Sequence, residues 1–393
     1  MRSRALAAAM AAVALMAAGC SSSGGGGEPA DPGTVKVGLV VSLSGTYQAV
    51  GTDMSDGFNL YLDTHDGKLG GRTVELLVGD EGDGPQTAVP AATKLIQSDG
   101  VHVLAGVVAG GSFAGIVPLL AENEVPLIGA NARPNIEDVS WIWSTSYFSD
   151  EPGRAIAGYV KDNVDGPVFA IGPDYQGGWD ELRGFTDEFA RIGGELANPD
   201  GETLFTPFPA TSNFLPYLSQ IAATDAEAVY TFYAGKAAID FVQQYRQSDV
   251  ADLPLYGAFL TEGTILDAQG DAATGILNVL NYSPDLDNAA NREFVAAWSA
   301  RHDRAPTTFA MSSYDAAAVL DLALASIDGE VTGAKINEAI AGLGQITSPR
   351  GNWTFNPTTR APVQKWYLRE VRQDGGTLAN VMVEELATLG ADT

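Results

Sequence analysis

The chain has 393 residues, of which 45% are apolar and 18% are charged, and its formal net charge is −27. This composition is typical of a globular protein, and the length indicates two domains because a single compact core rarely grows so large. The excess of acidic side chains argues against nucleic acid as a partner, since binding to phosphate backbones depends on basic patches.

Residues 1–19 are predicted to be a signal peptide. Two arginines precede an alanine-rich apolar stretch that is too short to span a bilayer comfortably. The stretch ends in Ala-Ala-Gly-Cys, which resembles the lipobox of bacterial lipoproteins, although Ala17 stands where leucine is usual. We therefore expect Cys20, the only cysteine, to be acylated and residues 20–33 to form a flexible tether. An ordinary secretory signal is the alternative.

Beyond the tether, short β-branched runs alternate with segments whose apolar residues recur at helical spacing. Strands are expected in the first half at 35–41, 73–79, 101–108 and 125–129, with helices between them. Alternation of this kind predicts parallel β-α-β units with helices on both faces of a sheet.

The same rhythm restarts near residue 152, which predicts a second unit of the same kind. Its strands are expected at 166–172, 226–233, 253–260 and 275–280. Two later helices, at 288–303 and 308–327, and a C-terminal hairpin at 365–386 complete the chain, the hairpin turning at Gln-Asp-Gly-Gly. The expected fold class is therefore α/β, with two doubly wound lobes.

Known catalytic motifs are missing from the sequence. The three histidines, His65, His102 and His302, stand apart from one another, and residues 110–115 narrowly miss a nucleophile elbow. Residues 80–84 carry carboxylates but lack the spacing of a calcium loop, and we interpret them as a solvated loop. We expect no enzymatic activity, no cofactor and no metal site, with an extracytoplasmic hydrolase as an alternative.

The loops that follow the predicted strands are suited to holding a small molecule. In open α/β sheets ligands bind at these carboxyl ends, where loops meet helix N-termini. Glycines allow backbone N–H groups to approach an anion there, and a guanidinium can pair with a carboxylate. The candidates are Tyr47, Gly110, Gly111, Ser112, Asn131, Ala132 and Arg133 in the first half, and Tyr175, Gln176, Trp179, Phe232, Tyr233, Phe259 and Glu262 in the second.

Several candidates have an alternative, purely structural role. Ser112 could cap the following helix, Arg133 could form a surface ion pair, and Glu262 could be the solvated start of a helix. One of Phe232 and Tyr233 is expected in the core, because successive strand residues point to opposite faces.

Taken as a series, these motifs resemble a known family. Residues 36–63 and 308–324 are similar to type I periplasmic substrate-binding proteins of ABC transporters, in the leucine/isoleucine/valine-binding family. Residues 172–185, 232–245 and 254–263 resemble the members associated with aromatic carboxylates. The resemblance implies two Rossmann-like lobes joined by three crossovers, with lobe 1 formed by 34–151 plus 283–347 and lobe 2 by 152–282 plus 348–393.

Site roles can be carried over by the same resemblance. It implies that the loop at 110–112 holds a ligand carboxylate and that Phe309 lies near the ligand side chain. Arg133 replaces a threonine, which favours an anionic ligand. Glu262 matches an acidic position that meets an ammonium group in amino-acid binders, whereas Gly177 replaces a tyrosine that those binders often have.

The function implied is that of a lipid-anchored, extracytoplasmic and monomeric solute-binding protein that delivers a small carboxylate, expected to be an aromatic acid, to an ABC permease in the membrane. Branched-chain or other amino acids are the alternative ligands. A ligand-sensing lipoprotein without a transport role is the alternative function.

Overall fold

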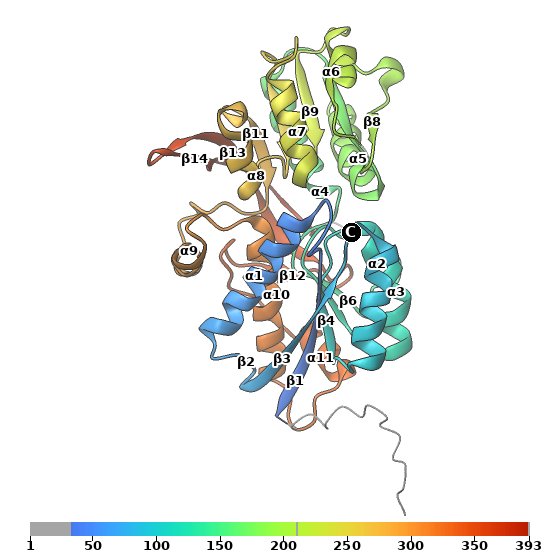
Figure 1. Ribbon diagram of the computed structural model, residues 1–393, viewed down its shortest axis with the longest axis vertical. Helices are drawn as coiled ribbons and strands as arrows, with labels where there is room; N and C mark the ends of the chain where they lie inside the picture. The colour runs from blue at the N-terminus through green and yellow to red at the C-terminus, as the bar shows by residue number, and fades with distance from the viewer. Residues whose placement is uncertain (1–32, 210, 392–393) are drawn as a thin grey trace, which may run out of the picture.

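Two α/β lobes are stacked along the long axis of the molecule (Figure 1). The computed structural model describes residues 33–209 and 211–391. The predicted signal peptide, Cys20 and nearly all of the predicted tether lie outside these residues. Within the described part of the chain, no helix is long and apolar enough to cross a bilayer.

The first lobe contains a six-stranded sheet in the order β2-β3-β1-β4-β5-β6, parallel except for the short β2. Its strands are β1 (Thr34–Val41), β2 (Lys68–Leu69), β3 (Arg72–Asp80), β4 (Val103–Gly106), β5 (Leu127–Gly129) and β6 (Ile142–Ser144). Its helices are α1 (Gln48–Thr64), α2 (Pro85–Thr93, continued as a π-helical turn over Lys94–Ser98), α3 (Gly110–Asn123), α10 (Thr308–Ala325) and α11 (Gly333–Ala341).

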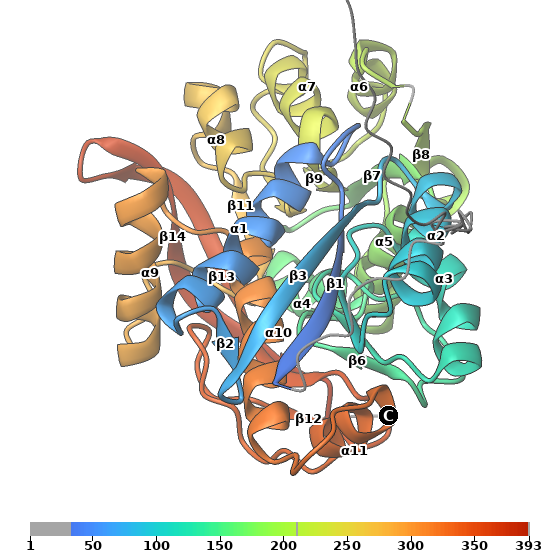
Figure 2. The same ribbon diagram turned by 60° about the horizontal axis from the view of Figure 1, so that its bottom comes forward.

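Both faces of this sheet are covered, as the predicted alternation requires. Val35, Val37 and Leu39 of β1 pack in the same core cluster as residues of α1 and α10. Val40 packs in a second cluster with residues of α2 and α3. Figure 2 shows β1 and β3 running side by side between α1 and the α2–α3 pair. The two-residue period of the strand therefore sends apolar side chains to both layers of helices.

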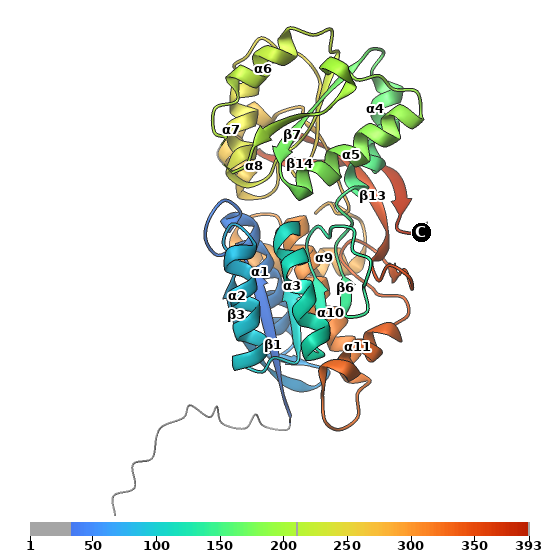
Figure 3. The same ribbon diagram turned by 90° about the vertical axis from the view of Figure 1, so that its right-hand side faces the viewer.

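The second lobe contains an eight-stranded sheet in the order β12-β13-β11-β10-β9-β7-β8, with β14 paired to β13. Its strands are β7 (Val168–Asp174), β8 (Leu204–Pro207), β9 (Ala228–Phe232), β10 (Leu255–Ala258), β11 (Leu277–Leu280), β12 (Thr354–Phe355), β13 (Pro362–Asp374) and β14 (Thr377–Leu389). Its helices are α4 (Glu151–Asn163), α5 (Gln176–Arg191), α6 (Leu215–Ala222), α7 (Gly235–Tyr245) and α8 (Thr264–Gln269), with 3₁₀ turns at Pro199–Gly201 and Gly270–Ala273. Figure 3 shows α4 and α5 on one side of the sheet and α6 and α7 on the other.

The chain passes between the lobes three times: from β6 to α4, from β11 to α10 and from α11 to β13. The predicted C-terminal hairpin is confirmed, since β13 and β14 pair antiparallel around Gly375 and Gly376, both at positive φ. Helix α9 (Ala289–His302) packs on residues of α1, α10 and β13, so it contacts both lobes. The predicted residue boundaries of the lobes therefore stay a prediction.

The three crossovers are joined by a buried polar cluster. The Arg350 guanidinium forms an ion pair with Asp315 (Nη2 to Oδ2, 2.9 Å) and donates to the carbonyl oxygen of Thr145 and to the Gln364 side chain. Gln364 also accepts a hydrogen bond from Asn281, at 2.9 Å. Residues from all three crossover regions thus meet around one guanidinium.

Candidate functional site

A cavity lies between the two lobes, at the carboxyl ends of their strands. It holds about 490 Å³ of space free of protein atoms, part of it open to solvent. Residues of the first lobe that line it are Tyr47, Val50, Val108, Ala109, Gly110, Asn131, Ala132, Tyr147, Ser149 and Phe309. Residues of the second lobe that line it are Tyr175, Gly177, Glu181, Phe232, Ala234 and Phe259.

The structure brings eight of the predicted site residues together around this cavity. They are Tyr47, Gly110, Asn131, Ala132, Tyr175, Phe232, Phe259 and Phe309. Each lies at the last residue of a strand, in the loop after a strand, or at the start of a helix, on the edge where the two sheets face each other. The topology alone places these positions at one edge, because parallel strands all end on the same side of their sheet.

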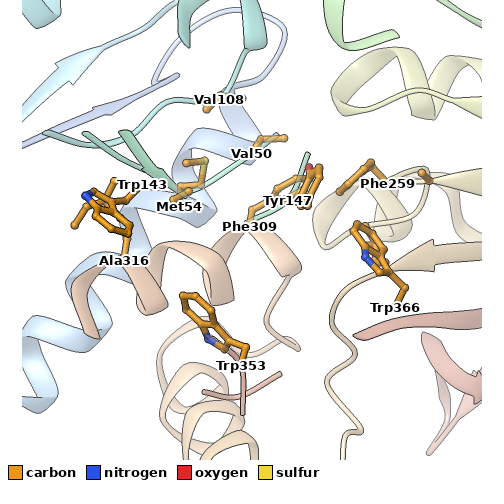
Figure 4. Close-up of a cluster of buried hydrophobic side chains, with 14 of the residues drawn as sticks. Val50, Met54, Val108, Trp143, Tyr147, Phe259, Phe309, Ala316, Trp353 and Trp366 are labelled. Carbon is orange, nitrogen blue, oxygen red and sulfur yellow. The ribbon is translucent and has the colours of Figure 1, made fainter. Parts of the chain in front are cut away.

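Aromatic rings form a continuous wall of the cavity. Tyr147 and Phe259 stack with their ring centroids 5.1 Å apart, and Phe259 lies 5.8 Å from Phe309 and 5.8 Å from Phe232. Figure 4 shows Tyr147 between Phe309 of the first lobe and Phe259 of the second, with Val50 nearby. Rings from both lobes therefore offer faces and edges to whatever occupies the cavity.

The Tyr147 ring is held in place by its own hydroxyl group. This hydroxyl donates to Asn131 Oδ1 at 2.9 Å, and Asn131 Nδ2 donates to the Val108 carbonyl oxygen at 2.7 Å. Asn131 therefore positions the aromatic wall through its side chain.

Four helices begin at the cavity. The residues that precede α1, α3, α5 and α7 are Tyr47, Ala109, Tyr175 and Ala234, and all four line the cavity. None of these four makes a side-chain cap hydrogen bond in the described part of the chain. The N-terminal end of a helix carries partial positive charge and unsatisfied N–H groups, so the four ends together favour an anion.

A carboxylate of the protein itself, that of Glu81, already accepts hydrogen bonds from backbone N–H groups just before α3. Glu81 is fully buried, and it accepts hydrogen bonds from the backbone N–H groups of Val108 (2.6 Å) and Ala109 (2.7 Å). Burial raises the pKa of Glu81 to about 7, although these bonds and the Ser112 hydroxyl oppose the rise. The interpretation of residues 80–84 as a solvated loop is therefore wrong for Glu81.

Glu181 is a cavity residue that the sequence analysis missed. It is 2% exposed, and one carboxyl oxygen accepts a hydrogen bond from the Tyr230 hydroxyl. Burial raises the pKa of Glu181 to about 8, while the bond from Tyr230 opposes the rise. The helical spacing of Gly177, Glu181 and Phe185 on α5 places Glu181 in the buried stripe of the helix. That stripe is the signal that could have found it.

Arg133 lies outside the cavity. Its guanidinium donates to the Thr359 carbonyl oxygen at 2.7 Å and lies over the Phe148 ring, 4.4 Å from its centroid. Burial lowers the Arg133 pKa to about 10. Arg133 lines a separate, charged cleft together with Arg154 and Arg183. The role predicted for Arg133 therefore has no support from its position.

Glu262 also lies outside the cavity and has partners within the protein. Its carboxylate forms a buried ion pair with Arg369 (2.5 Å) and accepts a hydrogen bond from the backbone N–H of Thr308 (3.1 Å). Thr308 is the first residue of α10, so the carboxylate compensates the N-terminal end of that helix. The Glu262 carboxylate, which was predicted to meet a ligand, is thus paired with groups of the protein itself.

The remaining predicted residues are not among those that line the cavity. Gln176 and Trp179 hydrogen-bond Asp180 and Asp174 on the outer side of α5. Tyr233 belongs to the core of the second lobe and shares a hydrogen bond with Thr206, so it is the core member of its pair with Phe232. Gly111 and Ser112 follow Gly110 on α3 without lining the cavity, and the Ser112 side chain is fully buried.

The lobes are closed over the cavity. The hydroxyl group of Tyr47 donates to that of Tyr175 at 2.9 Å, across the gap between the lobes. The Phe208 ring stacks on both tyrosines, at 5.7 and 4.5 Å between centroids. Gly235, at the start of α7, approaches the carbonyl oxygen of Thr46 so closely that a Cβ would lie 2.5 Å from it.

Comparison with known proteins gives one family. A model of the family described as periplasmic binding protein matches residues 34–377. The Leu/Ile/Val-binding protein homolog 6 of Brucella melitensis is 28% identical to this chain, over 91% of the chain and 92% of the relative.

Two solved structures of similar proteins are complexes with aromatic acids. A solute-binding protein of an ABC transporter from R. palustris, in complex with benzoate, is 32% identical, covers 90% of this chain and 97% of its own, and superposes with a TM-score of 0.81. A second from R. palustris, in complex with 4-hydroxybenzoate, is 27% identical with the same coverage and a TM-score of 0.83. A leucine-binding protein from Thermotoga maritima, at 19% identity, 90% and 98% coverage and a TM-score of 0.79, shares the fold.

Proposed function

Because the chain belongs to the periplasmic binding protein family, we propose that it is the solute-binding protein of an ABC transporter and that it captures a small aromatic carboxylate between its lobes. The observation that carries the proposal is the pairing of two features in one cavity. Aromatic rings from both lobes form its wall, and four helix N-termini point their positive ends at it.

The aromatic wall favours a planar apolar ligand. Burial of about 150 Å² of ligand surface contributes roughly 4 kcal/mol at about 25 cal/mol per Å². Micromolar affinity needs about 8 kcal/mol. Ring contacts alone therefore fall short, and a polar group on the ligand has to supply the remainder.

The helix N-termini favour a carboxylate as that polar group. Gly110 begins α3 and lines the cavity, so a carboxylate there can approach backbone N–H groups without a side chain in the way. Arg133 has no part in this proposal. Two relatives in complex with benzoate and 4-hydroxybenzoate support the same ligand class.

An amino acid is the second candidate ligand, because the ionised form of Glu181 could pair with an ammonium group in the cavity. A carboxylate at the cavity wall can meet the ammonium group of an amino acid, and Glu262, which was predicted for that role, is paired with Arg369 instead. The curated relative in Brucella is a Leu/Ile/Val-binding protein homologue.

The place of the protein in the cell is part of the proposal. We expect an extracytoplasmic, monomeric protein that is anchored through an acylated Cys20 and delivers its ligand to an ABC permease. Metabolic labelling with a radioactive fatty acid tests the anchor: wild type should incorporate label and Cys20→Ser should not.

The experiment that tests the ligand class is a thermal-shift screen of the purified chain against benzoates, hydroxycinnamates and aliphatic amino acids. A ligand at 100 times its Kd adds about 2.7 kcal/mol of apparent stability. An upward shift with aromatic acids supports the proposal. A shift with amino acids alone would favour the second candidate, and no shift with any carboxylate would overturn both.

A further inference from the structure

We propose that Glu181 and Ser149 form a polar subsite inside the cavity that selects ligands carrying a hydroxyl group in addition to their carboxylate. This inference rests on the proposed function, since it assumes that a small carboxylate occupies the cavity. It adds a specificity that the aromatic wall and the helix N-termini do not provide, because neither of these distinguishes a hydroxylated ring from a bare one.

The Glu181 side chain is only half satisfied. It lines the cavity and is 2% exposed, and one carboxyl oxygen accepts the hydrogen bond of Tyr230. The other oxygen, Oε2, is buried and has no hydrogen-bond partner among residues 33–209 and 211–391. The backbone N–H of Gly153, at the start of α4, also acts on this carboxyl group and opposes the rise in its pKa that burial causes. An unpaired buried oxygen is costly, so it is expected to find its partner in a bound molecule.

The side-chain hydroxyl group of Ser149 also lacks a hydrogen-bond partner among the described residues. Ser149 lines the same cavity and is 5% exposed. Its backbone N–H is used elsewhere, as a donor to the Arg133 carbonyl oxygen at 3.1 Å. The side-chain hydroxyl is therefore free to donate or to accept.

Ser149 and Glu181 both line the cavity, and they come from segments of the chain that pack against each other. Ser149 comes two residues before α4, and the start of α4 packs directly on the turn of α5 that carries Glu181. The closeness of this packing is visible at Gly153, where a Cβ would lie 2.5 Å from the Glu181 carbonyl oxygen. It is visible again at Gly184, where a Cβ would lie 2.1 Å from the Asp150 carbonyl oxygen.

A hydroxyl group matches this pair better than an ammonium group does. A hydroxyl both donates and accepts, so it can satisfy Oε2 of Glu181 and Oγ of Ser149 together, whichever way the protons point. Burial raises the pKa of Glu181 to about 8, so the carboxyl is largely neutral at pH 7. A neutral carboxyl donates a proton that an ammonium group cannot accept, whereas a hydroxyl can.

Calorimetric titration of the purified chain with benzoate and with 2-, 3- and 4-hydroxybenzoate tests the proposal. At least one hydroxybenzoate should bind about ten to a hundred times more tightly than benzoate, because benzoate leaves the buried oxygens unpaired. Ser149→Ala should reduce that preference. The double variant Glu181→Met/Tyr230→Phe removes both partners of the internal hydrogen bond, and it should abolish the preference for a hydroxylated ring.

Glu188→Gln is the matched control, because Glu188 lies on the same helix and forms an exposed ion pair with Arg191. It should leave all four affinities unchanged. If the double variant fails to fold, Ser149→Ala alone decides the role of the subsite.

Three outcomes would overturn the inference in distinguishable ways. Equal binding of benzoate and all three hydroxybenzoates to wild type would reject the subsite and leave the proposed function standing. Binding of leucine that is lost in Glu181→Gln would assign the subsite to an ammonium group. Failure of every aromatic acid to bind would reject the proposed function, and the inference with it.

Discussion

The hydroxyl groups of Tyr47 and Tyr175 meet at 2.9 Å, and they join the first residue before α1 in one lobe to the first residue before α5 in the other. Both side chains also line the cavity. The bond therefore exists only while the lobes are closed, and its contribution adds to the affinity for any ligand that requires closure.

Tyr175→Phe removes this interlobe hydrogen bond and keeps the ring. A hydrogen bond of this kind contributes about 0.5–1.5 kcal/mol, so the Kd for an aromatic acid should rise by about two- to tenfold. Titration calorimetry measures the change. Tyr217→Phe on α6, away from the cavity, is the control, and an equal loss in both variants would show that the bond between the lobes is not responsible.

Gly235→Ala tests lobe closure by steric obstruction. Gly235 has a φ of 59°, and its Cβ position lies 2.5 Å from the Thr46 carbonyl oxygen of the other lobe. Gly193→Ala is the matched control, because Gly193 has a φ of 80° and no atom within 4 Å of its Cβ position. Both variants should lose about 1 kcal/mol of stability from backbone strain. Only Gly235→Ala should lose about tenfold or more in ligand affinity. Similar ligand affinities in Gly235→Ala and Gly193→Ala would show that ligand binding does not require the lobes to close at the contact between Gly235 and Thr46.

Arg350→Met should destabilise the whole protein, because it breaks the buried cluster that joins the three crossovers. It leaves Asp315 without its ion-pair partner, in a site where both side chains are at most 2% exposed. Loss of one partner of a buried pair costs about 3–5 kcal/mol. Urea denaturation measures the loss. Arg292→Met is the control: it removes an exposed ion pair with Asp287 and should cost less than about 1 kcal/mol. If the two variants lost similar amounts of unfolding free energy, the buried cluster would not stabilise the protein as proposed.

The pH dependence of stability should reveal the buried carboxyl groups. Burial raises the pKa of Glu81 to about 7 and the pKa values of Glu151 and Glu181 to about 8, from an ordinary value of 4.5. The folded state then holds more protons than the unfolded state between about pH 4.5 and 8. The free energy of unfolding should therefore fall as the pH rises through this range.

Glu151→Gln isolates one of these groups, because an amide does not titrate. Burial lowers the pKa of His102, which acts in the opposite direction below pH 6.5, but this effect is common to wild type and variant. The difference in unfolding free energy between the two should change steadily from pH 5 to pH 8, with the wild type losing more. A difference that is constant with pH would show that Glu151 is not protonated in the folded protein.

The positions that form the cavity could be predicted from the sequence because topology determines them. Tyr47, Tyr175 and Phe259 follow strands, and all parallel strands of a sheet end at one edge. The pattern of apolar runs in the sequence is enough to predict where these strands end, and therefore which loops lie along that edge of the sheet.

The direction and partners of individual side chains could not be predicted in the same way. Arg133 hydrogen-bonds Thr359, 226 residues away, and Glu262 pairs with Arg369, 107 residues away. These partners come from the crossover and from the C-terminal hairpin, and no local pattern records their approach. Glu181 was missed for a different reason, since a glutamate on a helix is usually exposed and only its place in a stripe of buried residues marks it.

Titration calorimetry of benzoate and 4-hydroxybenzoate with wild type and Phe259→Leu addresses the proposed cavity most directly. Phe259 lies between Tyr147, Phe232 and Phe309, so leucine keeps an apolar but smaller side chain there and removes the ring that links the aromatic wall. We expect wild type to bind at least one of the two acids with a Kd in the micromolar range, which corresponds to a binding free energy on the order of 8 kcal/mol. Phe259→Leu should bind that acid about tenfold or more weakly. Equal affinity in the two proteins, or no binding to wild type, would mean that the cavity between the lobes is not the site of an aromatic acid.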